Sequence, residues 1–362
     1  MNKKVKIIIV IASVIAIVAT ILTIVFVQNL KDPEGTREYE MDGYKYKIEL
    51  RNDRGNEACF FIPQNGNEIH IPEEINIKER WIDRTYSVTE IKFDYVKEKL
   101  TPDSLIYKTK IIVPKTVSRI RDDGFEDKSY AYTYALINEE KMGFYVPNVG
   151  DIEVAKDNPY FDSRENSNCI IETKTDKILI AGLNNPKIPS TVTEIGSFAF
   201  YIYNQTELTI PSNVKKIDSC AFMGCESLKN LIIEEGVEEI AIYAFVLWDI
   251  FIEKDDRSRD NLNEIYIPST MKKISELPFT LFYSYDTKLY YNGSDFSSIV
   301  NKDLCYTDPQ RVGLTGKSTE DGYFEIEGWY SSMGDIYLYS ETAPSNEGNY
   351  WHYVDGNITI WE

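Results

Sequence analysis

The chain has 362 residues, of which 43% are hydrophobic and 13% aromatic, so it is too apolar for an intrinsically disordered protein. This length suits one or two ordinary domains or one elongated repeat array. After residue 6 the chain carries 36 basic residues against 58 acidic ones, which disfavours binding to nucleic acid or anionic lipid. Solubility is the simplest reason for this acidity.

The amino-terminal segment predicts a membrane anchor. Residues 7–27 form a run of 21 residues without a charge, which as a helix would span about 30 Å, the thickness of a hydrocarbon core. Three lysines precede the run at positions 3, 4 and 6, so residues 1–6 are expected to be a cytoplasmic tail and the rest extracellular. We therefore expect residues 7–27 to be a single-pass signal anchor at the cell membrane. A cleaved signal peptide, with a shorter apolar run and a small-residue cleavage site, remains the alternative.

The cysteines do not predict a disulfide framework, since an exported chain of this length has only five of them. Cys220 and Cys225 lie five residues apart, but no second pair and no histidines accompany them, so a zinc site is not expected. We interpret both as small apolar core residues, and we expect no metal and no cofactor.

Two nearly identical stretches indicate an internal repeat: "IPSTVTEIGSFAF" at 188–200 and "IPSNVKKIDSCAF" at 210–222. Copies begin at Val117, Val192, Val214, Val237 and Met271. Each has an isoleucine three residues later and a phenylalanine eight residues later: Ile120, Ile195, Ile217, Ile240 and Ile274, then Phe125, Phe200, Phe222, Phe245 and Phe279. Neighbouring copies from Val192 to Val237 are 22 and 23 residues apart, within the range of leucine-rich repeats.

The physical chemistry of one copy predicts one coil of a solenoid. In "LKNLIIEEGVEEIAIYAF", Leu231 and Ile233 alternate with Asn230 and Ile232, the spacing of a strand with two faces. A proline at the end of "TIP" or "YIP" cannot donate to a sheet, so it ends the strand. One coil cannot bury its own apolar face, whereas stacked coils can.

These motifs resemble the BspA-type leucine-rich repeats of bacteria, which carry a unit of the form I-P-x-x-V-x-x-I-G-x-x-A-F. The resemblance also includes "NPYFDSRENSNCIIETKTDKILIAGLNNPKIPS" at 158–190 and, more weakly, "GYKYKIEL" at 43–50 and the tail at 337–361. Glu234 in place of proline, Met271 in place of valine and Pro278 in place of alanine depart from the pattern. The resemblance implies a curved, strand-rich solenoid of the α/β leucine-rich-repeat class, displayed at the cell surface with adhesive or protein-binding roles.

The expected organisation follows from these segments. A linker and amino-terminal strands with a degenerate repeat, from "IHIPEEI" (69–75) to "SVTEI" (87–91), occupy residues 28–104. The repeat solenoid occupies 105–285, and a β-rich cap occupies 286–362.

No catalytic arrangement is expected from the sequence. The two histidines, His70 and His352, lie in distant segments, and no metalloprotease or phosphate-loop motif occurs. "FDSREN" at 161–166 places Asp162, Ser163 and Arg164 together, which we interpret as an ion pair that braces a turn. The chain is therefore not predicted to be an enzyme.

The remaining candidate for function is an outward-facing surface on the stacked strands. We call it the ledge, and it consists of Glu207, Thr209, Asn230, Ile232, Glu264 and Tyr266. Ile232 and Tyr266 are expected to be exposed there, which favours contact with a protein or surface glycan over a plain solvated face. We thus expect a membrane-anchored binding or adhesion module. The alternatives are an anchored cell-envelope hydrolase or its regulatory subunit, and a purely structural spacer.

Overall fold

The computed structural model describes Thr20 and the ranges 34–53, 55–63, 68–79, 82–93, 109–121, 149–201, 203–225, 227–242, 244–245, 262–275, 287–299, 317–318, 324–325, 336–345 and 348–361. No helix within these ranges is long and apolar enough to cross a membrane. The span expected at 7–27 lies outside them except for Thr20. The chain divides into two units, described separately below.

The first unit comprises the described parts of Met1–Pro63, Ile71–Lys92 and Thr116–Arg121. Its sheet has the order β1-β2-β3-β6-β5, with β8 also paired to β6. The strands are β1 (Gly35–Met41), β2 (Tyr44–Arg51), β3 (Glu57–Ile62), β5 (Glu74–Glu79), β6 (Ile82–Phe93) and β8 (Arg119–Ile120). Alternate residues of β2 are buried, as expected for a strand with one face on a core. The parallel pairing of β6 with β8 joins Ile91 to Ile120, the isoleucines of "SVTEI" and of the copy that starts at Val117.

The second unit begins with a parallel sheet of β4 (Glu68–His70), β7 (Lys110–Val113) and β9 (Asp151–Val154). Its repeats then form two further sheets. The short-strand sheet runs through β10 (Phe161–Asp162), β11 (Cys169–Glu172), β12 (Lys177–Ala181), β13 (Glu194–Ile195), β15 (Lys216–Ile217), β17 (Glu239–Ile240) and β19 (Lys273–Ile274). The long-strand sheet runs through β14 (Glu207–Ile210), β16 (Asn230–Ile233), β18 (Glu264–Ile267), β20 (Lys288–Tyr291), β23 (Ile336–Tyr339), β24 (Tyr350–Val354) and β25 (Asn357–Ile360). A two-stranded sheet of β21 (Lys317–Ser318) and β22 (Phe324–Glu325) stands apart from both in pairing.

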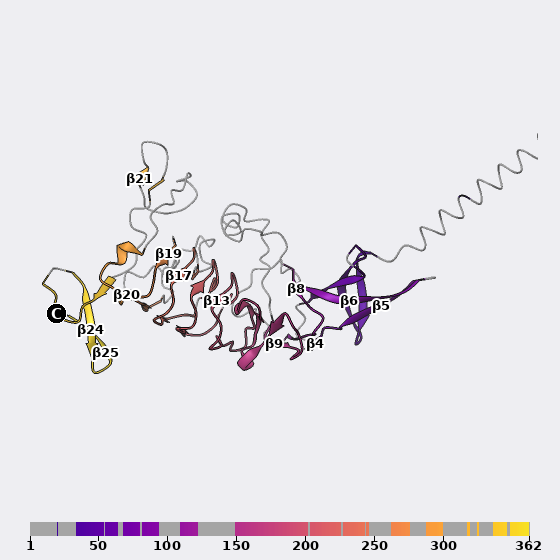
Figure 1. The fold of residues 1–362 in the computed structure, drawn as a ribbon, viewed down its shortest axis with the longest axis horizontal. Helices are drawn as coiled ribbons and strands as arrows, with labels where there is room; N and C mark the ends of the chain where they lie inside the picture. Colours follow the sequence, from indigo (N-terminus) through magenta and orange to yellow (C-terminus); the bar gives the residue numbers. More distant parts are fainter. Residues whose placement is uncertain are drawn as a thin grey trace, which may run out of the picture. The chain divides into compact units, whose positions relative to one another are not determined.

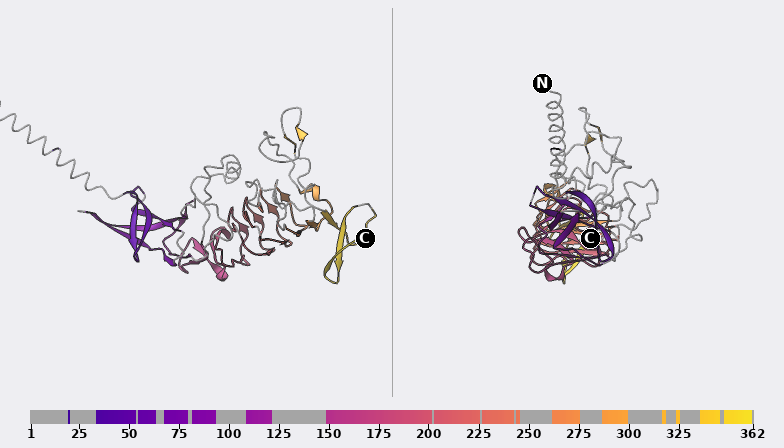
Figure 2. Two further views of the ribbon diagram at one scale, coloured as in Figure 1. Left: turned by 180° about the vertical axis from the view of Figure 1, so that it is seen from behind. Right: turned by 90° about the vertical axis from the view of Figure 1, so that its right-hand side faces the viewer.

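Each complete coil therefore adds one strand to each of the two repeat sheets, as Figure 1 shows from β13 to β20. Strands of successive coils pair in parallel, so a residue of one copy lies beside its equivalent in the next. The parallel ladder continues past residue 285 into β20 and β23, and the antiparallel hairpin of β24 and β25 follows it. The left view of Figure 2 shows this hairpin in yellow at the end of the series of coils.

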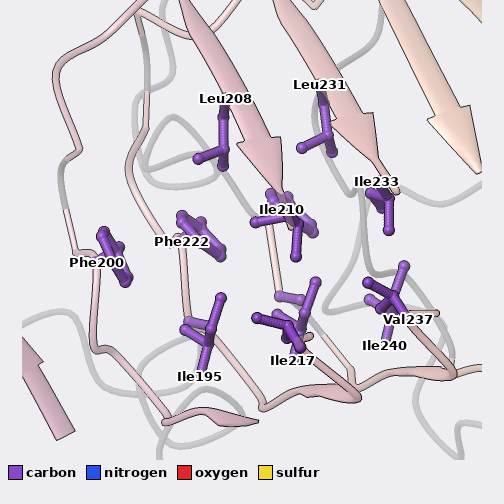
Figure 3. Close-up of a cluster of buried hydrophobic side chains, with 14 of the residues drawn as sticks. Ile195, Phe200, Leu208, Ile210, Ile217, Phe222, Leu231, Ile233, Val237 and Ile240 are labelled. Carbon is purple, nitrogen blue, oxygen red and sulfur yellow. The ribbon is translucent and has the colours of Figure 1, made fainter. Parts of the chain in front are cut away.

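The repeat register predicted from the sequence is confirmed in the core. Phe200, Phe222 and Phe245 are buried and stacked, with ring centroids 5.0 Å apart at both steps. The valine and isoleucine positions of the three complete copies are also buried. Figure 3 shows side chains from the long and short strands meeting in one interior, with the phenylalanines beside them. Phe125 and Phe279 lie outside the described residues.

The connections after the short strands are turns, although the α/β class would place helices there. Among the described residues of the repeats, residues 197–201 and 219–224 form turns. Phe198 and Cys220, at equivalent positions, both have φ of 58°. A non-glycine residue in this left-handed region cannot continue a right-handed helix. The sheets therefore belong to a strand-and-turn solenoid.

Carboxylates accept hydrogen bonds from three turns of the repeats, those at Ser190, Ser212 and Ser269. Glu165 accepts a hydrogen bond from the Ser190 hydroxyl at 2.7 Å, and Glu234 accepts one from the Ser212 backbone N–H at 2.9 Å. Glu235 accepts one from the Ser269 backbone N–H at 2.8 Å. Glu234, which replaces a proline of the repeat, thus ties its own coil to the preceding one.

Candidate functional site

The ledge lies on the outward face of the long-strand sheet. The structure pairs Glu207 with Asn230 and Asn230 with Glu264, which forms one row. It pairs Thr209 with Ile232 and Ile232 with Tyr266, which forms the second row. The six predicted residues are therefore brought together on three neighbouring strands.

The two faces of these strands differ sharply in burial. Leu231 is fully buried, whereas its neighbour Ile232 is 43% exposed. Glu207 and Thr209 are also exposed, and Asn230 is half-buried. This alternation is the geometry of a strand with one face on a core and the other face free. It explains how a large aliphatic side chain remains accessible in the middle of the array.

Tyr266 is half-buried, so the expectation that it is exposed is wrong. Its ring stacks on that of Tyr290 in the next strand, with centroids 4.9 Å apart and an interplanar angle of 7°. Its hydroxyl donates a hydrogen bond of 2.5 Å to the Glu264 carboxylate. A neighbouring ring and a neighbouring carboxylate therefore cover part of this side chain.

The outward row continues into an aromatic cluster, which we define as Tyr266, Tyr290, Tyr337, Tyr339, Trp351 and Tyr353. Tyr290 stacks on Tyr337 at 5.3 Å and meets Trp351 edge to face at 5.9 Å. The Trp351 indole N–H donates to the Tyr291 carbonyl at 3.1 Å. Tyr353, which contacts Tyr339 and Trp351, is 53% exposed. Packing on this face thus rigidifies the side chains that border the ledge.

Burial and the nearby Glu264 carboxylate keep the hydroxyls of Tyr266 and Tyr290 neutral. Burial raises the pKa of Tyr266, and the hydrogen bond and negative charge of Glu264 raise it further. Burial, followed by the charge of Glu264, raises the pKa of Tyr290 to about 12. These hydroxyls therefore remain hydrogen-bond donors over the whole physiological pH range.

The cluster was missed in the sequence because its strands lack the repeat's proline and valine. "TKLYYN" at 287–292 nevertheless aligns with "NEIYIP" at 263–268, and the structure pairs Tyr266 with Tyr290. "IYLYS" at 336–340 continues the same pattern, and Tyr290 pairs with Tyr337. An apolar residue followed two positions later by another, with tyrosine between them, was the available signal.

The "FDSREN" segment has the geometry of a structural brace. Arg164 makes ion pairs of 2.6 Å with both Asp162 and Asp176, and these carboxylates raise its pKa. The Ser163 hydroxyl donates to the Cys169 carbonyl at 2.8 Å. His352, the histidine nearest the aromatic cluster in sequence, stacks on Trp361 with centroids 3.7 Å apart. Within the described ranges, no group of three or more His, Cys, Asp or Glu side chains is placed to hold a metal ion.

Comparisons with known proteins agree with this architecture. The family model described as "BspA type Leucine rich repeat region" matches residues 180–286 in 6 copies. No curated protein matches the chain.

Three crystal structures of bacterial proteins are similar over part of the chain. A leucine-rich repeat protein from Eubacterium ventriosum is 17% identical with a TM-score of 0.33, and the match covers 56% of this chain and 51% of that one. The pneumococcal vaccine antigen PcpA is 13% identical with a TM-score of 0.27, covering 72% and 95%. A leucine rich cell surface protein from Faecalibacterium prausnitzii is 15% identical with a TM-score of 0.28, covering 75% and 98%.

This chain therefore spans about half the length of the Eubacterium ventriosum protein. TM-scores this low leave the assignment resting on the family match and on the observed repeat register. The chain thus contains a BspA-type leucine-rich repeat region at residues 180–286.

Proposed function

We propose that this protein is a surface-displayed binding module and that its partner lies on the ledge. The observation that carries the proposal is the outward row in which Ile232, 43% exposed, sits between Thr209 and Tyr266. An exposed aliphatic side chain beside a fixed aromatic ring provides the apolar centre that protein interfaces use. The carboxylates and amide of the parallel row provide a polar rim.

Membrane anchoring through residues 7–27 completes the proposal. The apolar run and the preceding lysines support it, as does the BspA-type repeat region, because resemblance to such repeats implies surface display. The exported chain would then hold the ledge on the outer side of the membrane.

The test compares ledge variants in a capture experiment. The exported part of the chain is immobilised and exposed to host-cell and cell-envelope extracts, and retained proteins or glycans are identified. Ile232→Lys with Tyr266→Lys removes apolar contact area and adds two positive charges, and we expect it to lower affinity about thirtyfold or more. Circular dichroism should show that both the double variant and Ile232→Lys alone are folded, and the single change at the exposed Ile232 should alter stability by about 0.5 kcal/mol or less.

Tyr160→Lys is the matched control for Ile232→Lys, because Tyr160 is 50% exposed and lies outside the ledge. It should leave binding unchanged. Equal affinity of the ledge double variant and the wild type would place the binding surface elsewhere. Complete absence of a saturable ligand would favour a structural spacer.

A further inference from the structure

Side-chain size changes abruptly along the outward row of the ledge, between Ile232 and Tyr266. We call this boundary the step. Thr209, Ile232, Tyr266 and Tyr290 occupy one line across four adjacent strands, which are spaced about 4.8 Å apart. One face of the Tyr266 ring is covered by Tyr290, while its neighbour on the other side is Ile232. Ile232 is shorter and 43% exposed. The aromatic stack therefore ends at Tyr266. The ring face of Tyr266 that is turned away from Tyr290 lies on the side of the shorter side chains Ile232 and Thr209.

The charges beside this step are negative. The Glu264 carboxylate lies at the Tyr266 hydroxyl, and exposed Glu207 stands in the same row with Asn230 between them. The basic residue of this row, Lys288, lies on the far side of Glu264 from the step. The net charge of the whole chain is −19. A ligand that reaches the step from the Ile232 side thus meets an aromatic face and the carboxylates of Glu207 and Glu264, with Lys288 on the opposite side of Glu264.

We propose that the step binds a basic segment of a protein partner, with a lysine or arginine side chain placed against the Tyr266 ring. This inference rests on the proposed function of the ledge and names the chemistry of the partner. The face of an aromatic ring attracts a cation, and arginine also stacks on it. Glu264 and Glu207 neutralise the charge that the cation brings, while Ile232 contacts the aliphatic stem of the side chain.

Charge decides between this partner and other ligands for an aromatic surface. Anionic glycans and nucleic acids would be repelled by Glu207 and Glu264. A neutral glycan could stack on tyrosine and donate hydroxyl hydrogen bonds to the carboxylates, but it would lack the charge attraction that a cation has for them. A basic polypeptide uses both features, and Thr209 and Asn230 can hydrogen-bond to its polar groups.

The test uses three probes with the full chain in detergent, measured by isothermal titration calorimetry. The first is a short synthetic peptide that alternates lysine and threonine, the second is the same peptide with every lysine acetylated, and the third is a neutral glucan oligosaccharide. We expect saturable binding of the lysine peptide that weakens as salt rises, and no binding of the other two.

Substitutions then separate a specific site from general attraction to an acidic protein. Tyr266→Leu should weaken binding about three- to fivefold, whereas Tyr266→Phe, which keeps the ring, should stay within about twofold. Glu264→Gln should weaken it about threefold, and the Tyr266→Leu/Glu264→Gln pair about tenfold. Asp157→Asn removes one exposed negative charge elsewhere and should have no effect.

Equal binding of the lysine peptide to wild type and Tyr266→Leu would overturn the inference, as would equal binding of the acetylated peptide. Binding of the glucan alone would also overturn it and would assign the step to neutral sugars. If the lysine peptide does not bind as expected while the Ile232→Lys/Tyr266→Lys variant still loses its captured partner, the ledge remains the binding surface. In that case only the claim that a basic side chain binds at Tyr266 is refuted. If that variant retains its partner, the proposed function itself fails.

Discussion

Phe222→Ala is the substitution that most directly probes how the coils support one another. Phe222 is fully buried, and its ring lies between those of Phe200 and Phe245, 5.0 Å from each. Its backbone N–H donates to the Ala244 carbonyl at 2.7 Å, and that of Phe200 donates to the Ala221 carbonyl at 2.8 Å. The Phe222 ring therefore contacts both neighbouring coils, and the peptide group that joins Ala221 to Phe222 hydrogen-bonds to both of them.

The expected cost is in the upper part of the range for such substitutions. Truncating a buried phenylalanine to alanine typically costs about 3–5 kcal/mol, from lost burial and from the cavity that remains. Two stacked ring contacts, each worth about 0.5–1.5 kcal/mol beyond burial, are lost together. The flanking rings lie in the turns that follow β13 and β17, and these strands are held in parallel ladders, so the rings cannot close the cavity without disturbing backbone pairing. We expect a loss of about 4 kcal/mol in the free energy of unfolding of the repeat region.

Native-state hydrogen exchange is the appropriate measurement, because the chain has two units and a single melting curve would mix them. The amides at positions 200 and 222 report the two inter-coil hydrogen bonds. A loss of about 4 kcal/mol corresponds to roughly a thousandfold faster exchange if these amides open with the array. Amides of β2 in the first unit should exchange at the wild-type rate.

Phe222→Leu is the control, since it retains most of the apolar volume and loses the ring contacts. We expect it to cost about 1.5 kcal/mol. If the amides of Phe222→Ala exchange at the wild-type rate, stacking of the three buried phenylalanine rings does not stabilise the repeat region. Faster exchange at position 222 with no change at 200 would refute the nearest-neighbour coupling expected of a solenoid.

Three further predictions concern topology, pH and backbone strain. The protein should fractionate with membranes and protease added to intact cells should degrade residues 32–362, whereas protection of that region would exclude the anchored topology. Burial raises the pKa of Glu235, but hydrogen bonds to its carboxylate lower this pKa more, so that it lies below 4.5 in the folded protein. The stability that Glu235 contributes should therefore be lost as the pH falls from 4.5 through the pKa of the folded state. Glu235→Gln should flatten this part of the urea-stability profile, and an unchanged slope would contradict that role. Gly236 has φ of 121° and a Cβ there would lie 2.3 Å from the Ser212 carbonyl oxygen, so Gly236→Ala should cost about 1–3 kcal/mol in urea unfolding.

The core could be predicted from the sequence because each coil repeats the same apolar spacing. Val214, Ile217 and Phe222 recur at fixed offsets, and parallel stacking then places each beside its equivalent. The outward direction of Ile232 followed in the same way, because strand residues alternate between faces. Local periodicity was sufficient for both.

The environment of Tyr266 could not be obtained from that periodicity. Its half-burial depends on Tyr290, which lies in a strand without the proline that marks the preceding repeats. The turns in place of helices depend on the left-handed conformation of Phe198 and Cys220, two residue types that do not usually signal it. In both cases the decisive information lies in tertiary contacts and backbone geometry that a pattern of apolar residues does not encode.

The strand geometry also explains how one short segment can serve both stability and binding. Leu231 faces the core, so it contributes to the free energy of unfolding. Its neighbour Ile232 faces outward, so in the proposed function it contributes to the free energy of binding. The inward rows must match those of the neighbouring coils, because each buried side chain packs against its equivalent in the ladder. No such constraint requires an aliphatic residue at position 232, where a polar side chain would be solvated without cost to the core. Ile232, with the Tyr266 ring fixed beside it, is therefore the position at which the proposed binding surface can be changed while the inward rows of the core stay intact.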